Sequence, residues 1–308
     1  FFMIKDLKKY LLKIKYCPIC SSKKITNIGI INSNRDDLNN LFNLLQCLNC
    51  NHRFLSKFPK EKFLNKLYLN NSDYVFGHTA DENIKKEQFI EKKFKNILAY
   101  NDHWIFNYIK KEKKGKYLEI GPGFCDLYKA FYSIGWKCEG VELQSWIKAP
   151  GIVNSINKIK KEKKDIVVML DVLEHSANPI KLLKSISKKH KISGKLFLCY
   201  PNSGSFKSKI LRTKWPMVSP LGHINFFSKK STLIMLKKCG YEPILIKSYS
   251  FVIFRRLFRN AIKLPFKIII DILKFNFLNI YKRLFELILN ILDLMNGDQI
   301  KVVAKRIK

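Results

Sequence analysis

The stretch that decides the fold of this chain is Tyr117-Leu118-Glu119-Ile120-Gly121-Pro122-Gly123-Phe124-Cys125. It has the pattern of an apolar strand that enters a glycine turn and continues into a helix. Glycine lets the backbone turn tightly, and it lets a ligand lie against the main chain because no Cβ stands in the way. Two glycines alone are weak evidence, so the interpretation depends on the sequence around the turn.

Strands and helices alternate from this turn onward. We expect strands at 116–120, 137–141, 152–154, 165–170, 195–200, 242–249 and 300–305, and helices at 126–134, 179–190 and 229–239. Such alternation predicts an α/β fold with a mostly parallel sheet and helices on both faces. Ligands of these sheets bind at the carboxyl ends of the strands. Residues that follow the strands are therefore candidate site residues.

Two acidic residues stand at informative positions near the turn. The second strand ends at Glu142, 21 residues after Gly121. A dinucleotide-type fold places an acid there to hold the ribose hydroxyls of its ligand. Glu119, directly before the glycines, suits a ligand with a cationic amino group rather than a pyrophosphate.

The motifs E-I-G-P-G (119–123), V-E (141–142), D-V-L-E-H (171–175) and Y-P-N (200–202) follow in an order that resembles the class I S-adenosylmethionine-dependent methyltransferases. The resemblance covers about residues 90–250 plus the last strand, and it is greatest to the ubiquinone-type and sugar methyltransferases. It implies a Rossmann-like seven-stranded sheet. The positions that it assigns to cofactor binding are Glu119, Gly121, Gly123, Glu142 and Asp171.

The sequence departs from this family at two places. Cys125 stands where the family has the third glycine of its loop. The stretch between Glu142 and Asp165 is short, so the acid that contacts adenine in the family is missing or replaced by Ser155 or Asn157.

The candidate catalytic residues are His175, His223 and Glu174. Glu174 and His175 follow the fourth strand of the sheet, and His223 follows the fifth. Methyl transfer requires alignment of the acceptor, and a hydroxyl acceptor must also lose a proton, for which histidine titrates in a suitable range.

Three roles remain open for these residues. They act as a base or position the acceptor, or Glu174 and His175 simply buttress the following helix. Alternatively, Asp171, Glu174, His175 and His223 bind a divalent cation that polarises a hydroxyl, in a pattern that resembles the small-RNA 2′-O-methyltransferases.

Four cysteines predict a structural zinc site. Cys17 and Cys20 form one CxxC pair, Cys47 and Cys50 form another, and 26 residues separate the pairs. Two such turns complete a tetrahedron of thiolates around one zinc ion. His52 is an alternative to one of these ligands, but it is expected to be a bystander. The remaining cysteines, Cys125, Cys138, Cys199 and Cys239, are expected to lie in the core.

We therefore expect a zinc ribbon at 1–58, a helical connector at 59–112 and a methyltransferase domain at 113–308. The connector has apolar residues at helical spacing, namely Phe89, Phe94, Leu98, Ile105 and Ile109. An amphipathic helical insert at 251–297 precedes the last strand. Between 251 and 295 it has eight basic and three acidic residues, a balance of 8 − 3 = +5. This pattern fits either an anionic membrane surface or a helical hairpin packed internally or in a dimer.

The whole chain of 308 residues has a net charge of +34, which favours anionic partners. No secretory signal or uncharged apolar run of spanning length is recognisable, so we expect a cytoplasmic protein, peripheral at the inner face of the membrane if the insert binds lipid. The expected function is O- or C-methylation of a small-molecule or glycan acceptor (a sugar, nucleotide sugar or lipid-linked sugar) in bacterial glycan biosynthesis. The alternatives are an RNA ribose methyltransferase that uses the basic surface and the zinc ribbon, and a non-enzymatic module that has lost the cofactor. The oligomeric state stays open.

Overall fold

The computed structural model of the chain describes residues 7–32, 38–70, 104–110, 112–144, 149–250, 264–265, 267–268, 271–272 and 276–308. The connector positions Phe89, Phe94 and Leu98 lie outside these residues, as does most of the expected insert between 251 and 275.

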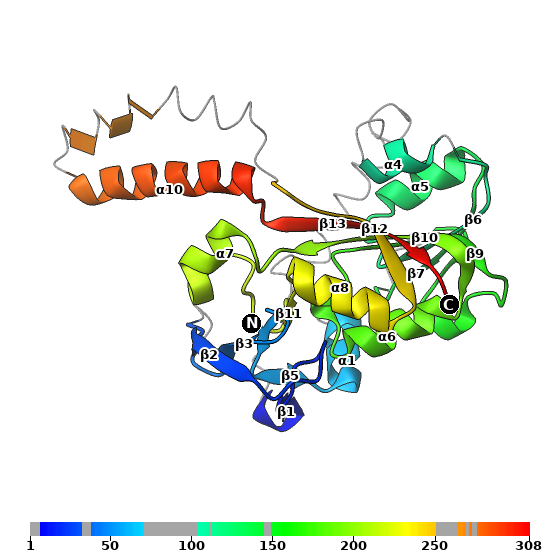
Figure 1. Cartoon of the computed structure of the whole chain (residues 1–308), viewed down its shortest axis with the longest axis horizontal. Helices are drawn as coiled ribbons and strands as arrows, with labels where there is room; N and C mark the ends of the chain where they lie inside the picture. The colour runs from blue at the N-terminus through cyan, green and yellow to red at the C-terminus, as the bar shows by residue number, and fades with distance from the viewer. Residues whose placement is uncertain are drawn as a thin grey trace.

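A seven-stranded sheet forms the centre of the molecule (Figure 1). Its strands are β6 (Lys116–Ile120), β7 (Lys137–Val141), β8 (Ile152–Val153), β9 (Lys164–Leu170), β10 (His190–Pro201), β12 (Tyr241–Tyr249) and β13 (Gln299–Arg306). Their order across the sheet is β12-β13-β10-β9-β6-β7-β8. Within this sheet β13 runs antiparallel to both of its neighbours, and the other pairs are parallel.

This sheet confirms the α/β fold and the strands expected from the sequence. The largest difference is at β10, which begins earlier than the expected residue 195. His190 already pairs with Lys164, and a register shift separates this pair from the regular ladder that starts at Lys195. An irregular extension of this kind leaves no mark on the apolar pattern of the strand.

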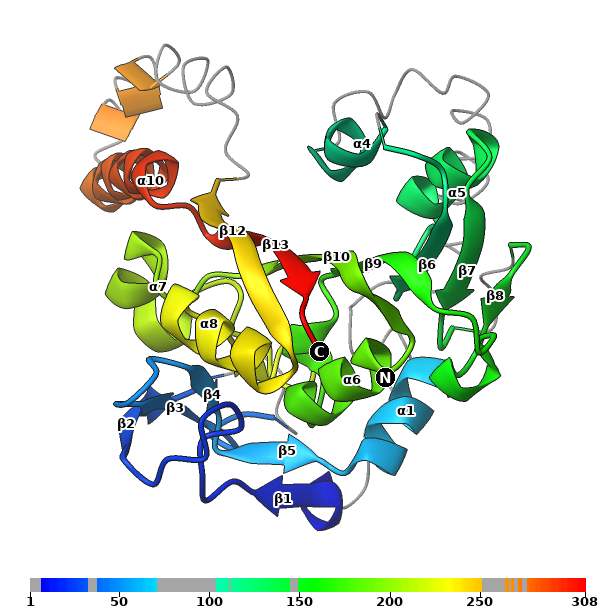
Figure 2. The same cartoon turned by 45° about the vertical axis from the view of Figure 1, so that its right-hand side comes forward.

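Helices cover both faces of the sheet (Figure 2). On one face, α4 (Trp104–Ile109) and α5 (Asp126–Ser133) pack against Tyr117, Val168 and Phe197. On the other face lie α6 (Pro179–Ser187) and α8 (Lys229–Lys238), which pack against residues of alternate strand positions such as Leu118 and Leu198. The period of two along each strand thus divides the core into two layers.

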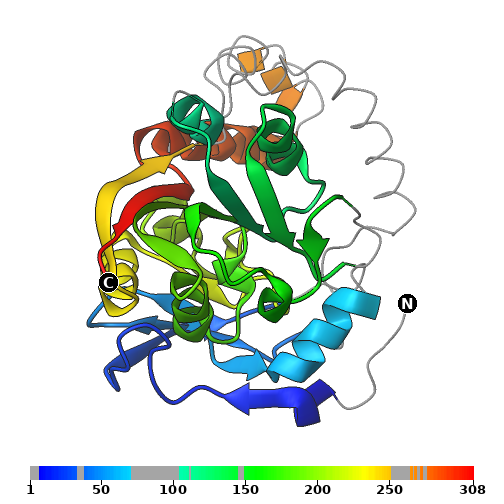
Figure 3. The ribbon, with the colours of Figure 1, turned by 90° about the vertical axis from the view of Figure 1, so that its right-hand side faces the viewer.

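The N-terminal elements lie on the side of the sheet that α6 and α8 cover (Figures 1 and 3). They comprise β1 (Leu11–Lys13), β2 (Ile25–Ile30), β3 (Asn43–Cys47), β4 (Arg53–Leu55), β5 (Lys57–Pro59) and α1 (Glu61–Asn70). One continuous apolar cluster joins Phe42 and Phe54 of this part to Leu198 of the large sheet.

A small four-stranded sheet in this part has the order β11-β4-β3-β2, and β1 pairs separately with β5. Its edge strand β11 (Asn225–Phe226) comes from the segment between β10 and α8. The small sheet therefore contains a strand from far along the chain.

Two helices lie near the start of β13. α10 (Phe277–Met295) packs against α7 (Phe206–Leu211) and extends away from the large sheet in Figure 1. Among the described residues, no helix is both long enough and apolar enough to cross a bilayer.

Candidate functional site

A cavity of about 840 Å³ lies at the carboxyl ends of β6, β7, β8 and β9. This volume is within the usual range for sites that bind small molecules. Six of the predicted site residues line the cavity: Gly121, Gly123, Glu142, Asp171, His175 and His223.

The glycine turn forms one wall of the cavity. Gly121 has a φ of 65°, and a Cβ at this residue would lie 2.7 Å from Cγ2 of Val172. Gly123 has a φ of 53°, and a Cβ there would meet nothing within 4 Å. Gly121 thus allows close packing against the loop that follows β9, whereas Gly123 leaves open space above the turn. Cys125 has a φ of 63°, which explains why a glycine suits this position in related loops.

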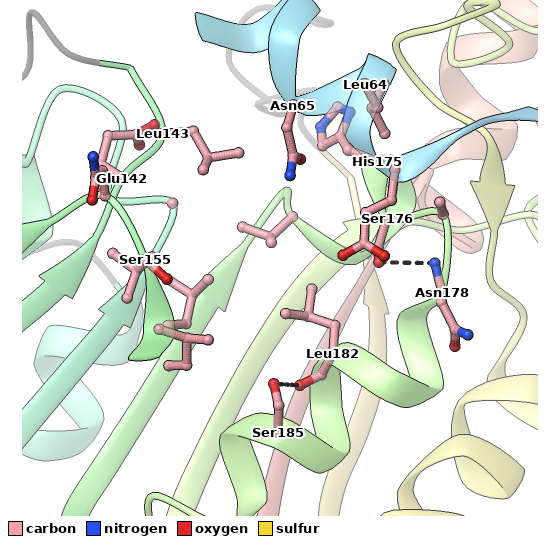
Figure 4. Close-up of a pocket in the computed structure, with 18 of the residues that line it drawn as sticks. Leu64, Asn65, Glu142, Leu143, Ser155, His175, Ser176, Asn178, Leu182 and Ser185 are labelled. Atoms are coloured by element: carbon pink, nitrogen blue, oxygen red, sulfur yellow. Dashed lines mark hydrogen bonds between the residues drawn. The ribbon is translucent and has the colours of Figure 1, made fainter. Parts of the chain in front are cut away.

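Glu142 is held in place by backbone N–H groups. Gly123 N donates to its Oε2 at 3.2 Å, and Gln144 N donates to its Oε1 at 3.0 Å. Burial raises the pKa of this carboxyl, and the two backbone donors act against that rise. Figure 4 shows Glu142 on one side of the cavity, with Ser155 on the neighbouring strand end. Ser155 and Asn157 both line the cavity, at the place where the sequence lacks an acid.

Glu119 is placed differently from the other predicted cofactor residues. It is buried beneath the glycine turn, does not line the cavity, and accepts a hydrogen bond of 2.7 Å from Tyr117 Oη. Burial raises its pKa to about 8, although the bond from Tyr117 opposes that change. Because Glu119 does not line the cavity, its contact with a cationic amino group stays a prediction.

Asp171 adopts an unusual backbone conformation at the cavity wall. Its φ is 51°, a left-handed value that is costly for a residue with a side chain, and its N–H donates to Cys199 O at 2.9 Å. Burial raises the pKa of its carboxyl to about 6.

The structure brings Glu174, His175 and His223 together. The two imidazole centroids are 4.9 Å apart, and one ligand atom from each of the three residues lies within 4.8 Å of the others. The fully buried Glu174 carboxyl shares a hydrogen bond with the side chain of Asp171. Burial, and then the charge of Asp171, raises the pKa of Glu174 well above its ordinary value.

Backbone carbonyls orient both histidines. His175 Nδ1 lies 2.7 Å from Gly222 O, and His223 Nδ1 lies 2.8 Å from Met217 O. A carbonyl can only accept, so Nδ1 donates in each of these bonds. The backbone of Asp171 is a further hydrogen-bond partner of His175. Burial lowers the pKa of His175 to about 3, and burial also lowers the pKa of His223.

The four cysteines of the two CxxC pairs also meet. Cys17 Sγ is 3.5 Å from Cys50 Sγ, Cys20 Sγ is 3.4 Å from Cys47 Sγ, and all four sulfurs lie within 4.8 Å of one another. Sulfurs around a tetrahedral zinc ion, at about 2.3 Å from it, are separated by roughly 3.8 Å. The donor set and spacing therefore fit a zinc ion.

Several cavity residues had no signal in the sequence. Glu61, Leu64 and Asn65 come from α1, and Lys181 comes from α6; Figure 4 shows Leu64 and Asn65 at the cavity. Lys181 Nζ and Glu61 Oε2 are 3.6 Å apart. A helical connector was expected over 59–112, but only the tertiary fold places α1 over the ends of the strands.

Comparison with known proteins agrees with this arrangement. A family model described as a methyltransferase domain matches residues 91–246. This range includes the glycine turn, Glu142 and the segment from Asp171 to His175. No curated protein matches the sequence.

Many solved structures are similar to this chain at low sequence identity. An S-adenosylmethionine-dependent methyltransferase from Mesorhizobium loti is 11% identical, with 66% of this chain and 96% of that chain covered and a TM-score of 0.45. One from Archaeoglobus fulgidus is 14% identical, with 71% and 94% covered and a TM-score of 0.41. Phosphoethanolamine N-methyltransferase 2 from Haemonchus contortus, in complex with S-adenosyl-L-methionine, is 14% identical, with 83% and 63% covered and a TM-score of 0.43.

Proposed function

The chain belongs to the family of methyltransferase domains, S-adenosylmethionine-dependent enzymes, and from this premise we propose which group it methylates. The acceptor is a hydroxyl group of a small molecule or glycan, such as a sugar, a nucleotide sugar or a lipid-linked sugar. The observation that carries this proposal is the cluster of Glu174, His175 and His223, in which the two histidines line the cavity and Glu174 is buried behind it. Such a cluster is of use for an acceptor that must lose a proton, as a hydroxyl must.

The cofactor part of the cavity is formed by the strand ends on the other side. Gly121 and Gly123 let the ligand approach the main chain, and the Glu142 carboxylate is oriented to accept hydrogen bonds from ribose hydroxyls. Ser155 and Asn157 take the adenine end. Asp171 lines the same cavity as Ser155 and Asn157, and it precedes His175 and His223 in the sequence.

A cation-binding role fits the cluster better than a base role. A base works best with a pKa near the working pH, and burial keeps that of His175 near 3. Metal-binding histidines usually donate their other N–H to a carbonyl or carboxylate, as both histidines do here. The carboxyl of Glu174, which is hydrogen-bonded to that of Asp171, supplies an oxygen ligand near both imidazoles. We propose that Asp171, Glu174, His175 and His223 hold a divalent cation, which would polarise the acceptor hydroxyl.

Methyl transfer after chelation tests this proposal. Protein treated with a chelator is supplied with Mg²⁺, Mn²⁺ or Zn²⁺ and with methyl-labelled cofactor. The acceptor panel contains monosaccharides, nucleotide sugars, lipid-linked sugars and transfer RNA. We expect an O-methylated sugar whose formation depends on added metal, with imidazole ligands favouring transition metals over Mg²⁺.

The control variant is Ser185→Ala, a cavity residue whose Oγ bonds only to Leu182 O of its own helix in Figure 4. Glu174→Gln should abolish metal dependence and reduce turnover on the order of 100-fold, whereas Ser185→Ala should keep both. Label in RNA ribose and in none of the sugars would replace the sugar acceptor with RNA. Full turnover in Glu174→Gln would remove the cluster from the chemistry.

We also propose that α10 docks on an anionic membrane surface. Its exposed apolar residues recur every three or four positions, at Phe277, Tyr281, Leu284, Ile288, Ile291 and Met295. Leu278 and Leu294 beside this row are exposed as well. Positions that flank the seam of a coiled coil are usually charged, so this wider face suits acyl chains better than a second helix. α10 itself has two basic and two acidic residues, and the balance of +5 over 251–295 comes from the residues that precede it; these favour anionic lipid next to the helix.

Flotation with phosphatidylglycerol-containing vesicles tests the membrane proposal. The wild type should float with the vesicles, and Ile288→Asp should stay in the lower fraction. Asn279→Asp adds the same charge to the polar side of α10 and should float. Absence of wild-type flotation would contradict the proposal, and a dimer that Ile288→Asp dissociates would assign this face to a second copy of the chain.

A further inference from the structure

The segment that carries His223 is built into the cysteine-containing sheet. β11 (Asn225–Phe226), two residues after His223, pairs antiparallel with β4. β4 starts three residues after Cys50, the last of the four clustered cysteines. The main chain that follows this histidine is therefore tied to the small sheet beside the four cysteines, here called the cysteine-containing sheet, as well as to the end of β10, where Phe227 bridges Asn202.

A second connection runs through side chains. His52 Nε2 lies 3.1 Å from Asn225 Oδ1, and Asn225 Nδ2 donates to Ser176 O at 2.7 Å. His52 and Asn225 are completely buried. Because Asn225 donates through its nitrogen to Ser176, its oxygen faces His52, and His52 donates from Nε2. This His52–Asn225–Ser176 bridge joins the second cysteine turn to the residue directly after His175.

Main-chain hydrogen bonds run beside this bridge. Leu55 N donates to Ile224 O at 3.1 Å, and Ile224 N donates to Glu174 O at 2.9 Å. Ser228 Oγ donates to Cys50 O at 2.9 Å. Hydrogen bonds therefore link the cluster residues to the cysteine-containing sheet. Glu174 is itself bonded to Ile224, which follows His223 and bonds to Leu55 of β4. His175 precedes Ser176, which bonds to Asn225 of β11.

A buried polar bridge is a costly way to join two layers when apolar packing alone would fill the space. Unpaired polar groups are expensive in a core, so such a bridge favours the arrangement in which its two hydrogen bonds are made. His52 Nδ1 has no hydrogen-bond partner among the described residues, so Nε2 provides the directional contact of this ring. The aromatic rings around His52 supply the packing. Phe227 lies 4.9 Å and Phe54 lies 5.8 Å from the imidazole centroid. The hydrogen bonds add direction to that packing.

We propose that His52 and Asn225 are positioning residues, through which the four-cysteine site sets the placement of His175 and His223 at the cavity. They touch neither cofactor nor acceptor. This inference rests on the proposed function, in which the two cavity histidines act on the acceptor. It gives the cysteine site a part in methyl transfer beyond holding its own fold.

The test compares paired variants of the whole protein loaded with zinc. His52→Leu and Asn225→Leu remove the bridge at similar side-chain volume. His52→Gln keeps a side-chain N–H that reaches Asn225, and it is the conservative rescue. His190→Leu is the matched control, because it removes a buried imidazole that bonds to Tyr241 and lies outside the cavity.

Imidazole NMR of ¹⁵N-histidine protein provides the readout that needs no acceptor. The ring signals of His175 and His223, assigned by substitution, should shift or broaden in the two bridge variants and keep wild-type positions in His190→Leu. His52→Gln should restore them. Zinc content per chain and cofactor Kd should stay within about twofold of wild type. Turnover on the sugar that the wild type methylates should fall on the order of 100-fold with little change in cofactor KM, since displacement of reacting groups by about 1 Å has that effect.

The outcomes separate this inference from the proposed function. Unchanged signals of His175 and His223 in both bridge variants would overturn the positioning role, whatever the acceptor is. The same shift in His190→Leu would also overturn it, because the effect would then be general loosening. Displaced signals with full turnover would support the positioning role and would instead refute the part given to the histidines in methyl transfer.

Discussion

At the scale of single residues, the two glycines of the turn have different roles: one allows close packing within the protein, and the other leaves space for a ligand. Both glycines have left-handed φ values, but the space above each differs. A Cβ on residue 121 meets Val172, next to Asp171, whereas a Cβ on residue 123 meets no protein atom within 4 Å. One glycine therefore serves the fold, and the other leaves room for a ligand.

Gly121→Ala and Gly123→Ala should consequently differ in what they damage. Backbone strain costs about 1–2 kcal/mol in either variant. Gly121→Ala should lose more stability than that because of its clash, and should lower Tm further. Gly123→Ala should weaken cofactor binding out of proportion to its loss of Tm. Calorimetric titration with S-adenosylmethionine, together with thermal melts, measures both effects, and equal losses of affinity and Tm in the two variants would contradict this division.

Buried histidines make the stability of the protein depend on pH. His190 is completely buried, bonds to Tyr241 Oη at 3.1 Å, and has a pKa that burial lowers to about 4. In an unfolded chain the pKa is about 6.5, so below that pH the unfolded state takes up a proton that the folded state refuses. The contribution is complete above pH 6.5 and is lost as the pH falls toward 4.

His190→Gln should flatten this dependence. The difference in Tm between pH 7 and pH 5 should be smaller in the variant than in the wild type. It should not vanish, because burial also lowers the pKa of His52 and His175. Thermal melts at several pH values check this, and a variant that loses as much stability in acid as the wild type would show that His190 is not a source of the effect.

At the scale of elements, the sequence predicted those helices and strands whose formation depends on residues close together in the chain. The apolar runs at 116–120 and 165–170 were recognisable as strands because a buried parallel strand needs little else. β11 has two residues, and it exists because β4 is beside it. α1 was expected as a helix, but its place at the cavity depends on packing between distant segments. The pairing of His175 with His223 was anticipated from their positions after strand ends, whereas the bridge through Asn225 had no signal.

The four-cysteine cluster allows a prediction at this scale. Its residues belong to the same apolar cluster as the large sheet, so loss of a metal there should destabilise more than the N-terminal part. Cys17→Ser should lose bound zinc and several kcal/mol of the free energy of unfolding. Cys239 is a buried cysteine outside the cluster, so the Cys239→Ser variant should keep the zinc bound by the four clustered cysteines. Zinc analysis with denaturant unfolding measures both, and wild-type stability in Cys17→Ser would exclude a structural metal.

At the scale of the whole molecule, the basic charge of the chain differs from the apolar face of α10 in how it is distributed. The net charge of +34 extends along the chain, so it favours anionic partners in general and identifies none. The exposed apolar face is confined to one helix, α10, which packs against α7. Composition alone predicted an amphipathic segment there, but only the structure shows that the apolar face of α10 is exposed.

The order of strands in the large sheet also bears on how the protein is made. β13 lies between β12 and β10, yet it is the last of the three to leave the ribosome. Until residues 299–306 are synthesised, β12 lacks the neighbour with which it pairs in the finished sheet, and one side of β10 stays open. Open strand edges invite association between chains. A nascent chain that pauses within the 251–297 stretch would therefore expose unpaired edges of both β10 and β12. We expect chaperones to bind the nascent chain mainly during this interval of translation.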